Sequence, residues 1–471
     1  MFNLKDLVEY IGYFFLVYMV IYTSYLFITV LYGSLQLYKQ DKMTRFRNEL
    51  KHEYYVPISV LVPAYNEEVT IVGSINSLLN LDYKLYELVI INDGSKDKTS
   101  EMLINTFQMI KTNRPIHGRI KCEKILEVYE SVVSDVQITL IVKKNGGKGD
   151  ALNAGINLSR YPYVITIDAD SLLQRDSLEK IIQPVLRDDR IIAVGGMIRI
   201  AQTVLMEKGK VMDYHVPWNP IVGMQVVEYD RSFLASRILL DQFNANLIIS
   251  GAFGLFKKEI LMSVGGYSTD TLGEDMELVM KINTFCINNG LDYKLTYEPN
   301  AICWSQSPSS LNDIIKQRKR WYLGLFQSLW KYRSMMNPLK SGFNRTFSYL
   351  YYVFFELLSP FIEVIGVLNI LLAWYLNLLF VPYMIRLLII YTIYNILLSI
   401  TAFFQRVYSQ GTKMHLTDVI KAILMVSLET VFYRYILSFV RATAFIGYRK
   451  NKKHWGTIER KEFNTKTSTV E

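Results

Sequence analysis

The sequence has few of the residues that build disulfide frameworks or metal sites with sulfur and nitrogen ligands. Its three cysteines, Cys122, Cys286 and Cys303, lie far apart, and none of the five histidines stands at a metal-ligand spacing from another. Disulfide-rich proteins and zinc modules need closely spaced ligands. Both classes are therefore excluded.

Charged residues are also scarce. They make up 20% of the 471 residues, whereas 51% are hydrophobic, and the chain holds 33 Tyr, 24 Phe and 6 Trp. A disordered or low-complexity chain has the opposite balance and is excluded. The net charge of +9 suits nucleic acid, anionic lipid or a phosphorylated substrate. Because the sequence contains no nucleic-acid motif, we assign this charge to membrane lipid and a diphosphate, and expect no nucleic-acid partner.

The excess of apolar residues lies at the two ends of the chain. Residues 10–38 carry no charge, and about 20 apolar residues suffice to cross a bilayer. The run is too long for the apolar part of a signal peptide and is followed by no cleavage site, which favours an uncleaved anchor. Five basic residues follow it: Lys39, Lys42, Arg45, Arg47 and Lys51. The positive-inside rule then predicts that the N-terminus is outside and that everything after Lys39 is cytoplasmic.

A second apolar block covers residues 347–405 and predicts two crossings, 347–375 and 380–404. A last apolar segment, 422–447, contains Glu429, Arg434 and Arg441. If it crossed, the basic residues 449–453 would lie outside, against the positive-inside rule. Two other arrangements stay open: an interfacial or re-entrant segment, or a crossing whose charges face a polar cavity.

Residues 47–341 have the composition of a soluble domain in which β-rich runs alternate with helical ones. Strands are predicted at 58–62, 88–91, 138–142, 164–167 and 191–194, and helices at 69–79, 99–107, 150–158 and 177–186. This alternation predicts an α/β fold with a mainly parallel sheet and helices on both faces. An insertion at 111–135 is expected to form an extra surface helix. In such sheets ligands bind beyond the carboxyl ends of the strands.

Polar motifs follow four of the predicted strands. They are Pro63-Ala64-Tyr65-Asn66-Glu67-Glu68, Asn92-Asp93-Gly94-Ser95, Lys144-Asn145-Gly146-Gly147-Lys148-Gly149 and Asp168-Ala169-Asp170. Each motif alone is an ordinary turn or helix cap. Together, at one edge of a sheet, they suit a metal-bound diphosphate. Asp168 and Asp170 offer oxygen ligands to Mg²⁺ or Mn²⁺, while Lys148 and helix N-termini meet the phosphates.

Three more motifs follow in order: Ser250-Gly251-Ala252-Phe253-Gly254, Gly273-Glu274-Asp275 and Gln317-Arg318-Lys319-Arg320-Trp321. With the first four, this set resembles the processive family-2 glycosyltransferases, which include cellulose, hyaluronan and poly-N-acetylglucosamine synthases. The last motif matches the Q-x-x-R-W of the polymer-forming members. Gly273 is a departure, because many members carry Thr there. The resemblance covers residues 57–456 and implies a GT-A-type fold inserted between N- and C-terminal transmembrane helices.

The resemblance also implies roles for particular residues. Asp275 would be the catalytic base, and Asp168 and Asp170 would hold the metal. The donor-binding residues would be Ala64, Tyr65, Glu67, Asp93, Lys148, Asp168 and Arg320. The acceptor-binding residues would be Ser250, Gly251, Glu274, Gln317 and Trp321.

Five segments are expected from the motifs and apolar runs. They are a transmembrane anchor (1–46), a cytoplasmic GT-A domain (47–306), amphipathic interface helices (307–341), a C-terminal transmembrane region (342–456) and a cytoplasmic tail (457–471). The expected partners are a UDP-sugar, a growing glycan and membrane lipid. The small membrane part also leaves room for a homo-oligomer or accessory secretion subunits. No regulatory barrel follows the last helix, so control by cyclic-di-GMP is not expected.

The leading hypothesis is a multi-pass plasma-membrane enzyme that polymerises UDP-glucose or UDP-N-acetylglucosamine into a β-linked polysaccharide and passes it across the membrane. Direct displacement with a single base predicts inversion at the anomeric carbon. One alternative is a non-processive transferase acting on a polyprenyl phosphate, against which the Q-x-x-R-W motif argues. The other is a non-catalytic transporter or scaffold, which would leave the carboxylates and Lys148 unexplained.

Overall fold

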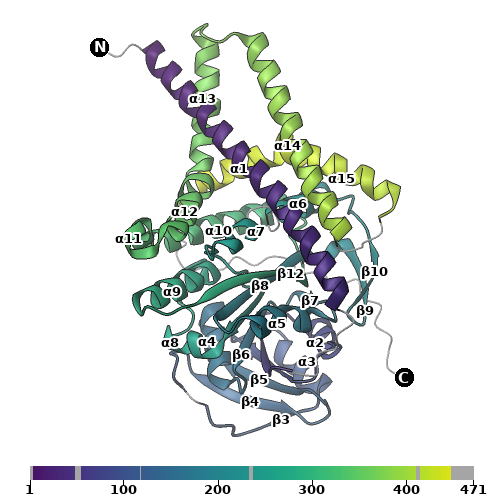
Figure 1. Cartoon of the computed structure of the whole chain (residues 1–471). Coiled ribbons are helices and arrows are strands. Elements are labelled where there is room, and N and C mark those ends of the chain that lie inside the picture. Colours follow the sequence, from purple (N-terminus) through teal and green to yellow (C-terminus); the bar gives the residue numbers. More distant parts are fainter. Residues whose placement is uncertain (1–3, 48–54, 117, 233–236, 410–413, 447–471) are drawn as a thin grey trace.

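A ten-stranded mixed sheet forms the centre of the domain between the apolar ends of the chain (Figure 1). The computed structural model describes residues 4–47, 55–116, 118–232, 237–409 and 414–446. The strand order is β3-β4-β5-β2-β1-β6-β11-β8-β12-β7. The strands are β1 (Ile58–Ala64), β2 (Tyr86–Asn92), β3 (Met109–Lys111), β4 (Ile125–Ser131), β5 (Gln137–Lys143), β6 (Tyr163–Ile167), β7 (Ser171–Leu173), β8 (Ile191–Ile200), β11 (Phe253–Lys257) and β12 (Lys294–Ser305).

The five predicted strands are β1, β2, β5, β6 and β8, and all five are confirmed. β5, β2, β1 and β6 are parallel neighbours, and β8 pairs in parallel with β12. Every residue of β2 and β8 is buried, which explains why these strands read as continuous apolar runs without alternation. β11 runs antiparallel between β6 and β8 and was not predicted.

Helices cover both faces of the sheet, as predicted. On one face lie α2 (Ile71–Leu79), α3 (Thr99–Thr106), α5 (Ser177–Arg187) and α6 (Pro220–Arg231); on the other lie α4 (Lys148–Leu158), α8 (Lys258–Ser263) and α9 (Glu274–Asn288). In α2, Ile71, Ile75 and Leu78 recur at helical spacing and are fully buried. Each face therefore has its own hydrophobic core.

The prediction of an extra surface helix at 111–135 is wrong. This stretch contributes β4, which pairs antiparallel with β5 and with the short β3 and so extends the sheet at its edge. The apolar residues of β4 pack only in part: Val128 is buried, whereas Leu126 is exposed. β4, the second strand from this edge, has one solvated face and therefore a weaker apolar pattern than the central strands, so its type was hard to read from the sequence.

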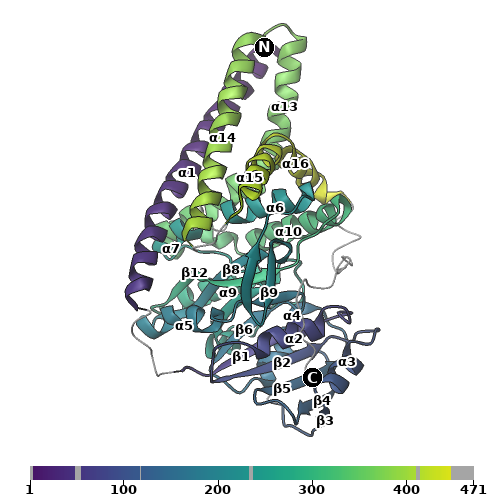
Figure 2. The ribbon, with the colours of Figure 1, turned by 90° about the vertical axis from the view of Figure 1, so that its right-hand side faces the viewer.

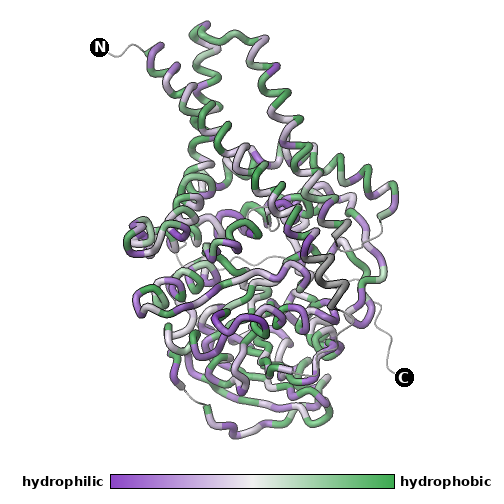
Figure 3. The backbone as a smooth tube through the Cα atoms, in the orientation of Figure 1, coloured by the Kyte–Doolittle hydropathy of each residue, from purple (hydrophilic) through white to green (hydrophobic). Residues whose placement is uncertain are grey.

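Three apolar helices stand above the sheet domain. They are α1 (Leu4–Arg47), α13 (Ser359–Tyr375) and α14 (Val381–Ser409). The N-terminal end of α1 and the turn between α13 and α14 lie at the end farthest from the sheet (Figures 1 and 2), and hydrophobic residues dominate this bundle (Figure 3). Helices long and apolar enough to cross a membrane include Leu4–Lys39 and Val381–Gln405.

The predicted crossing 347–375 is not one straight helix. α12 (Phe343–Tyr351) continues through a π-helix, η4 (Tyr352–Leu357), and a 45° bend separates this part from α13. Pro360 explains the break, because its ring disfavours a helical residue before it and it lacks an N–H. Only α13 of this pair joins α1 and α14 in the bundle (Figure 1).

The last apolar segment, which the sequence left open, forms α15 (Leu416–Leu428), a π-helix η5 (Glu429–Tyr433) and α16 (Arg434–Ala442). Its length and composition would allow a crossing. It nevertheless lies at the base of the bundle beside α6 and α10 (Leu311–Lys331), and does not reach the level of the α13–α14 turn (Figures 1 and 2). The basic residues 449–453 and the predicted tail 457–471 lie outside the described residues.

Helix α6 joins the sheet domain to the apolar helices. The guanidinium of Arg231 donates two hydrogen bonds to the carboxylate of Glu429 in η5, at 2.7 and 2.8 Å, and a third to Ser399 of α14 at 3.0 Å. Both charged side chains are largely buried. Removing only one partner of a buried, bidentate ion pair strongly destabilises the folded protein.

Glu429→Leu is therefore expected to destabilise the protein by about 3–5 kcal/mol, because it leaves Arg231 buried and unpaired. The measurement is thermal unfolding in detergent. The double variant Arg231→Met/Glu429→Leu should recover most of this loss. Glu259→Gln, at an exposed ion pair with Lys257, is the control and should change stability by less than about 1 kcal/mol. Equal losses of stability in all three variants would contradict a stabilising role for the buried Arg231–Glu429 pair.

Candidate active site

Lys148 is the centre of a charged cluster at the carboxyl ends of the central strands. It is the first residue of α4, and its ammonium forms an ion pair with Asp168, which directly follows β6. The carboxylate of Glu274 lies 3.8 Å away. Burial alone would lower the pKa of Lys148, but Asp168 and the neighbouring acidic residues raise it above its ordinary value. Lys148 therefore stays a cation within a cluster of carboxylates, which suits a diphosphate.

Glu274 and Asp275 begin helix α9 on the other side of Lys148. Burial raises the pKa of Glu274, and the charge of Asp275 adds to this shift, whereas Lys148 and Arg320 oppose it. The two oxygens of Asp275 accept N–H bonds from Gly251 at 3.2 Å and from Met276 at 2.8 Å. The backbone therefore holds this carboxylate in one orientation.

Gly251 lies against both charged groups. A Cβ atom at this position would come within 3.2 Å of the Lys148 ammonium nitrogen and 3.3 Å of the Asp275 Cβ. A side chain here would crowd both groups, and the contact that Gly251 makes with Asp275 comes from its backbone N–H. Ser250 is half-buried, and its hydroxyl accepts a weak bond from Ala252 N–H at 3.4 Å.

The unusual Gly273 is explained by the helix that carries Arg320 and Trp321. Gly273 packs on Gly324 of α10, one turn beyond Arg320, and a Cβ at Gly324 would lie 2.7 Å from the Gly273 backbone. This close approach brings α10 against the start of α9, where Arg320 faces Glu274 electrostatically. A larger residue at 273 would push the two helices apart.

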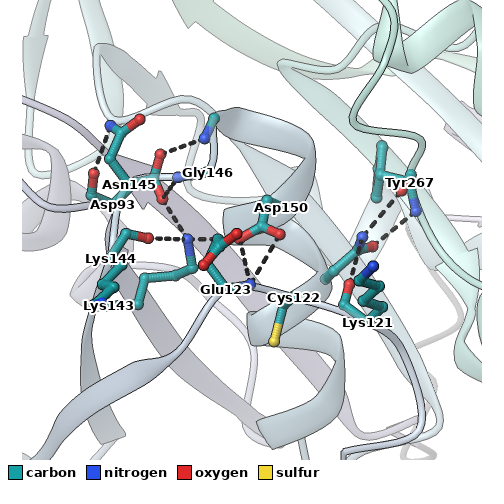
Figure 4. A network of polar contacts seen from close by, with 12 residues as sticks. Asp93, Lys121, Cys122, Glu123, Lys143, Lys144, Asn145, Gly146, Asp150 and Tyr267 are labelled. Atoms are coloured by element: carbon teal, nitrogen blue, oxygen red, sulfur yellow. Dashed lines mark hydrogen bonds and ion pairs between the residues drawn. The ribbon is translucent and has the colours of Figure 1, made fainter.

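Asp93 belongs to a second, fully buried charged group (Figure 4). The ammonium of Lys143, at the end of β5, lies 2.5 Å from Asp93 and 2.6 Å from Asp150 of α4. Asp93 also accepts the N–H groups of Gly146 and Gly147, at 3.0 and 2.7 Å. Burial raises the pKa of Asp93, and Lys143 partly offsets this effect. Asp93 therefore holds the loop that precedes Lys148.

The first two motifs form one interlocked loop pair. The N–H of Asn66 donates to Ser95 at 3.0 Å, and its side-chain oxygen accepts the N–H of Lys96 at 2.8 Å. The N–H of Glu67 donates to Thr99 at 3.0 Å. Asn66 adopts a left-handed conformation, with φ of 55°, which Asn tolerates better than most residues. The two loops are therefore held in a fixed relation.

The other residues predicted to bind the donor base differ in exposure. Ala64, the last residue of β1, is buried, as is Glu67, whose carboxylate accepts the hydroxyl of Thr70 at 2.7 Å. Tyr65 is exposed. That these residues line a nucleoside pocket remains a prediction.

Trp321 lies on α10 with one face covered. The guanidinium of Arg318 is 4.6 Å from its ring centroid, and the ring of Tyr229, on α6, is 6.4 Å away. Trp321 remains 40% exposed, whereas Arg318 is buried and donates to Glu228 at 2.6 Å. Arg318, in the basic stretch of the Q-x-x-R-W motif, therefore points into the protein and not toward a surface. Gln317 is half-buried on the same helix.

The structure brings one part of the predicted site together. Lys148, Asp168, Gly251, Glu274 and Asp275 are in mutual contact or close by. Several residues that support the site belong to none of the predicted motifs: Lys143, Glu228, Tyr229 and Gly324. A lysine ending the apolar run of β5 was a signal for Lys143, but no local pattern marked the other three.

The acidic residues fit a hard divalent ion. Asp168 is partly exposed and Asp170 is buried, and both follow β6. Among the described residues, no group of three or more His, Cys, Asp or Glu side chains is suited to hold a metal. Two carboxylates completed by substrate phosphates and water form the donor set that Mg²⁺ takes. Asp168 and Asp170 could hold such an ion.

Lys143→Met is expected to lower stability by about 3–5 kcal/mol, because Asp93 and Asp150 would face each other without their shared cation. Thermal unfolding in detergent measures this loss. The matched control is Lys144→Met, the same substitution at the next, exposed residue, and it should be nearly neutral. Similar melting temperatures for the two variants would show that the buried triad is not stabilising.

Comparison with known proteins identifies the family to which this fold belongs. A model of "Glycosyl transferase family group 2" matches residues 163–407, and one of "Glycosyl transferase family 2" matches residues 59–121. The poly-beta-1,6-N-acetyl-D-glucosamine synthase of Staphylococcus epidermidis is 31% identical over 277 residues, 58% of this chain and 56% of the relative. The corresponding Staphylococcus aureus synthase is 32% identical over 270 residues, 57% of this chain and 54% of the relative.

The matched region thus spans little more than half the length of these relatives. Among solved structures, a mannosyltransferase from Pyrobaculum calidifontis in complex with GDP-Man and Mn²⁺ superposes with a TM-score of 0.51 at 19% identity, covering 83% of this chain and 97% of that one. This likeness supports the predicted GT-A-type fold. The resemblance found in the motifs is confirmed, and because the first family model spans more than half of the sequence, this chain belongs to the family-2 glycosyltransferases.

Proposed function

We propose that this chain is a membrane-embedded, processive, inverting glycosyltransferase that builds a β-linked polysaccharide from a UDP-sugar. The observation that carries the proposal is the cluster of Lys148, Asp168, Glu274 and Asp275, which Arg320 joins where the Gly273–Gly324 contact brings α10 against α9. The Staphylococcus relatives are polymer synthases, which favours a polymer over single transfer. They also make UDP-N-acetylglucosamine the first donor to test, ahead of UDP-glucose.

The donor side of the reaction requires a stabilised leaving diphosphate. Lys148 and Arg320 are the cations beside the acidic cluster, and each can pair with a phosphate oxygen. Asp168 and Asp170 would hold Mg²⁺ or Mn²⁺, whose charge neutralises the leaving group when bound. The ion pair of Lys148 with Asp168 keeps the lysine in place before the donor arrives.

On the acceptor side, Asp275 is the proposed base. A base must come within about 2.6–3.2 Å of the hydroxyl whose proton it accepts. The N–H groups of Gly251 and Met276 fix the direction of its carboxylate. Attack by the activated hydroxyl on the face opposite the diphosphate would invert the anomeric carbon. Trp321, which is partly exposed and rigidly backed, would support the terminal sugar.

The arrangement of the helices supports a multi-pass protein with a cytoplasmic catalytic domain. The long apolar helices α1 and α14 extend away from the sheet (Figure 2), and the positive-inside rule favours a cytoplasmic sheet domain. Tyr18, Tyr22 and Tyr25 of α1 stack near Phe355 of η4. These stacked rings pack η4 against α1 and so join the bent segment to the apolar bundle.

The proposal is tested with the purified full chain in detergent or vesicles. We expect UDP-N-acetylglucosamine with Mg²⁺ or Mn²⁺ to give UDP and a growing β-linked polymer, and EDTA to stop both. Turnover of UDP-glucose in parallel identifies the donor. Single additions to a supplied polyprenyl phosphate would instead favour the non-processive alternative. No turnover with any donor would refute the proposal.

Asp275→Asn should lower the polymerisation rate by about 10²–10⁴-fold, because the amide cannot accept the acceptor proton. UDP release measured at saturating donor gives the rate. Asp270→Asn is the control, since Asp270 is exposed five residues upstream of Asp275 and its side chain is 74% accessible; it should keep wild-type activity. Activity of Asp275→Asn within a few-fold of wild type would exclude Asp275 as the base.

Trp321→Ala should shorten the polymer and weaken acceptor binding by about 1–2 kcal/mol, the typical value of a lost aromatic contact. Product length on gels is the measurement. Trp330→Ala is the matched control, because Trp330 lies on the same helix and is exposed. Polymers of unchanged yield and length from Trp321→Ala would rule out its acceptor role.

A further inference from the structure

Glu228 lies where three helices meet, next to the proposed acceptor site. It belongs to α6, and one carboxylate oxygen accepts a 2.6 Å hydrogen bond from Arg318 of α10. The other oxygen is 3.8 Å from the guanidinium of Arg441 in α16. The side chains of Glu228 and Arg318 are only 10% and 5% accessible. A charged pair this deeply buried is expensive to maintain, so its location needs an explanation.

Arg318 connects this ion pair to the indole of Trp321. Its guanidinium carbon lies 4.6 Å from the ring centroid, a cation–π distance. Burial would lower the pKa of Arg318, but Glu228 raises it above its ordinary value, so the guanidinium stays charged. Tyr229, the residue after Glu228, lies near the same indole. Trp321 is therefore supported from two directions by neighbouring residues of α6 and α10.

Helix α6 is itself firmly anchored. Asn219 caps its first turn by accepting the N–H of Ile221 at 2.9 Å. Gln225 donates to the carbonyl of Pro308, just before α10, at 2.8 Å. Arg231 is bound to Glu429. Because α6 cannot shift easily, the position of Glu228 determines where Arg318 lies, and Arg318 limits the orientations of Trp321.

We propose that Glu228 is a positioning residue of the acceptor site: it holds Arg318 against Trp321, so that the open part of the indole meets the terminal sugar of the glycan. The inference rests on the proposed function. It predicts that the Glu228–Arg318 pair affects acceptor binding and polymer length more than donor binding, although neither residue reaches the sugar.

The rival explanation is that the pair only holds α6 and α10 together. The two explanations predict different primer KM values when Glu228 and Trp321 are replaced together. If Glu228 acts through Trp321, its removal has no further effect once the indole is gone. If Glu228 acts only on helix packing, the fold-changes in primer KM of the two single variants multiply in the double variant.

The experiment compares wild type, Glu228→Gln, Trp321→Ala and the double variant, all as full-length protein in detergent. A β-linked N-acetylglucosamine oligosaccharide is the primer, and initial rates at varied primer concentration separate KM from kcat. We expect Glu228→Gln to raise the primer KM roughly three- to tenfold, as loss of a cation–π contact implies. Polymer length should fall, while UDP affinity changes less than about twofold. The double variant should match Trp321→Ala.

Two further variants complete the test. Arg318→Lys keeps the charge but loses the planar stack, so it should reproduce the KM effect. Asp313→Asn, which breaks the partly exposed pair with Lys316 on the same helix, is the control and should leave the primer KM unchanged. Should Glu228→Gln fail to fold, Glu228→Gln/Arg318→Gln replaces it, because this variant leaves no lone buried charge at the pair.

Two results would overturn the positioning role. One is a double variant in which the fold-changes in primer KM multiply, and the other is a lowered UDP affinity with an unchanged primer KM. A wild-type primer KM in Glu228→Gln, with normal polymer from the wild-type chain, would refute only this inference. Absence of polymer from the wild-type chain with every donor would instead refute the proposed function.

Discussion

The candidate site depends on the pairing of one buried ammonium with several carboxylates. Lys148 lies between Asp168 and Glu274, with Asp275 nearby. Without the lysine, these acidic groups would repel one another where they are partly buried, and without them burial would lower the pKa of the lysine. Because the opposite charges stabilise one another, the cluster can form before substrate binds. Catalysis by charge stabilisation requires such a preorganised site.

Two supports keep this cluster in place, one on each side. The buried Asp93–Lys143–Asp150 triad ties the loop before Lys148 to the strands (Figure 4). On the opposite side, the Gly273–Gly324 contact lets α10 approach α9 closely. Helix α6 extends the second support to the apolar helices through paired charges. The candidate site and the apolar helices are thereby connected through α6 and α10.

Much of the sheet could be read from the sequence because its central strands are buried on both faces. The apolar runs of β1, β2, β5, β6 and β8 have few alternative explanations. Strand β4, next to the edge strand β3, was misread, since one of its faces is solvated and its pattern is mixed. The bend before α13 was missed because apolar composition reports the length of a hydrophobic run and not its direction, although Pro360 marked the place.

The sequence by itself determined the residue types of the site and their position after successive parallel strands, because strand ends of one sheet must meet at one edge. Only the tertiary structure decided which charges pair. Arg318, in a motif that reads as basic and exposed, is buried against Glu228, and Asp93 faces Lys143. Such pairs join residues far apart in the chain, and their geometry depends on helix packing, which no local pattern encodes.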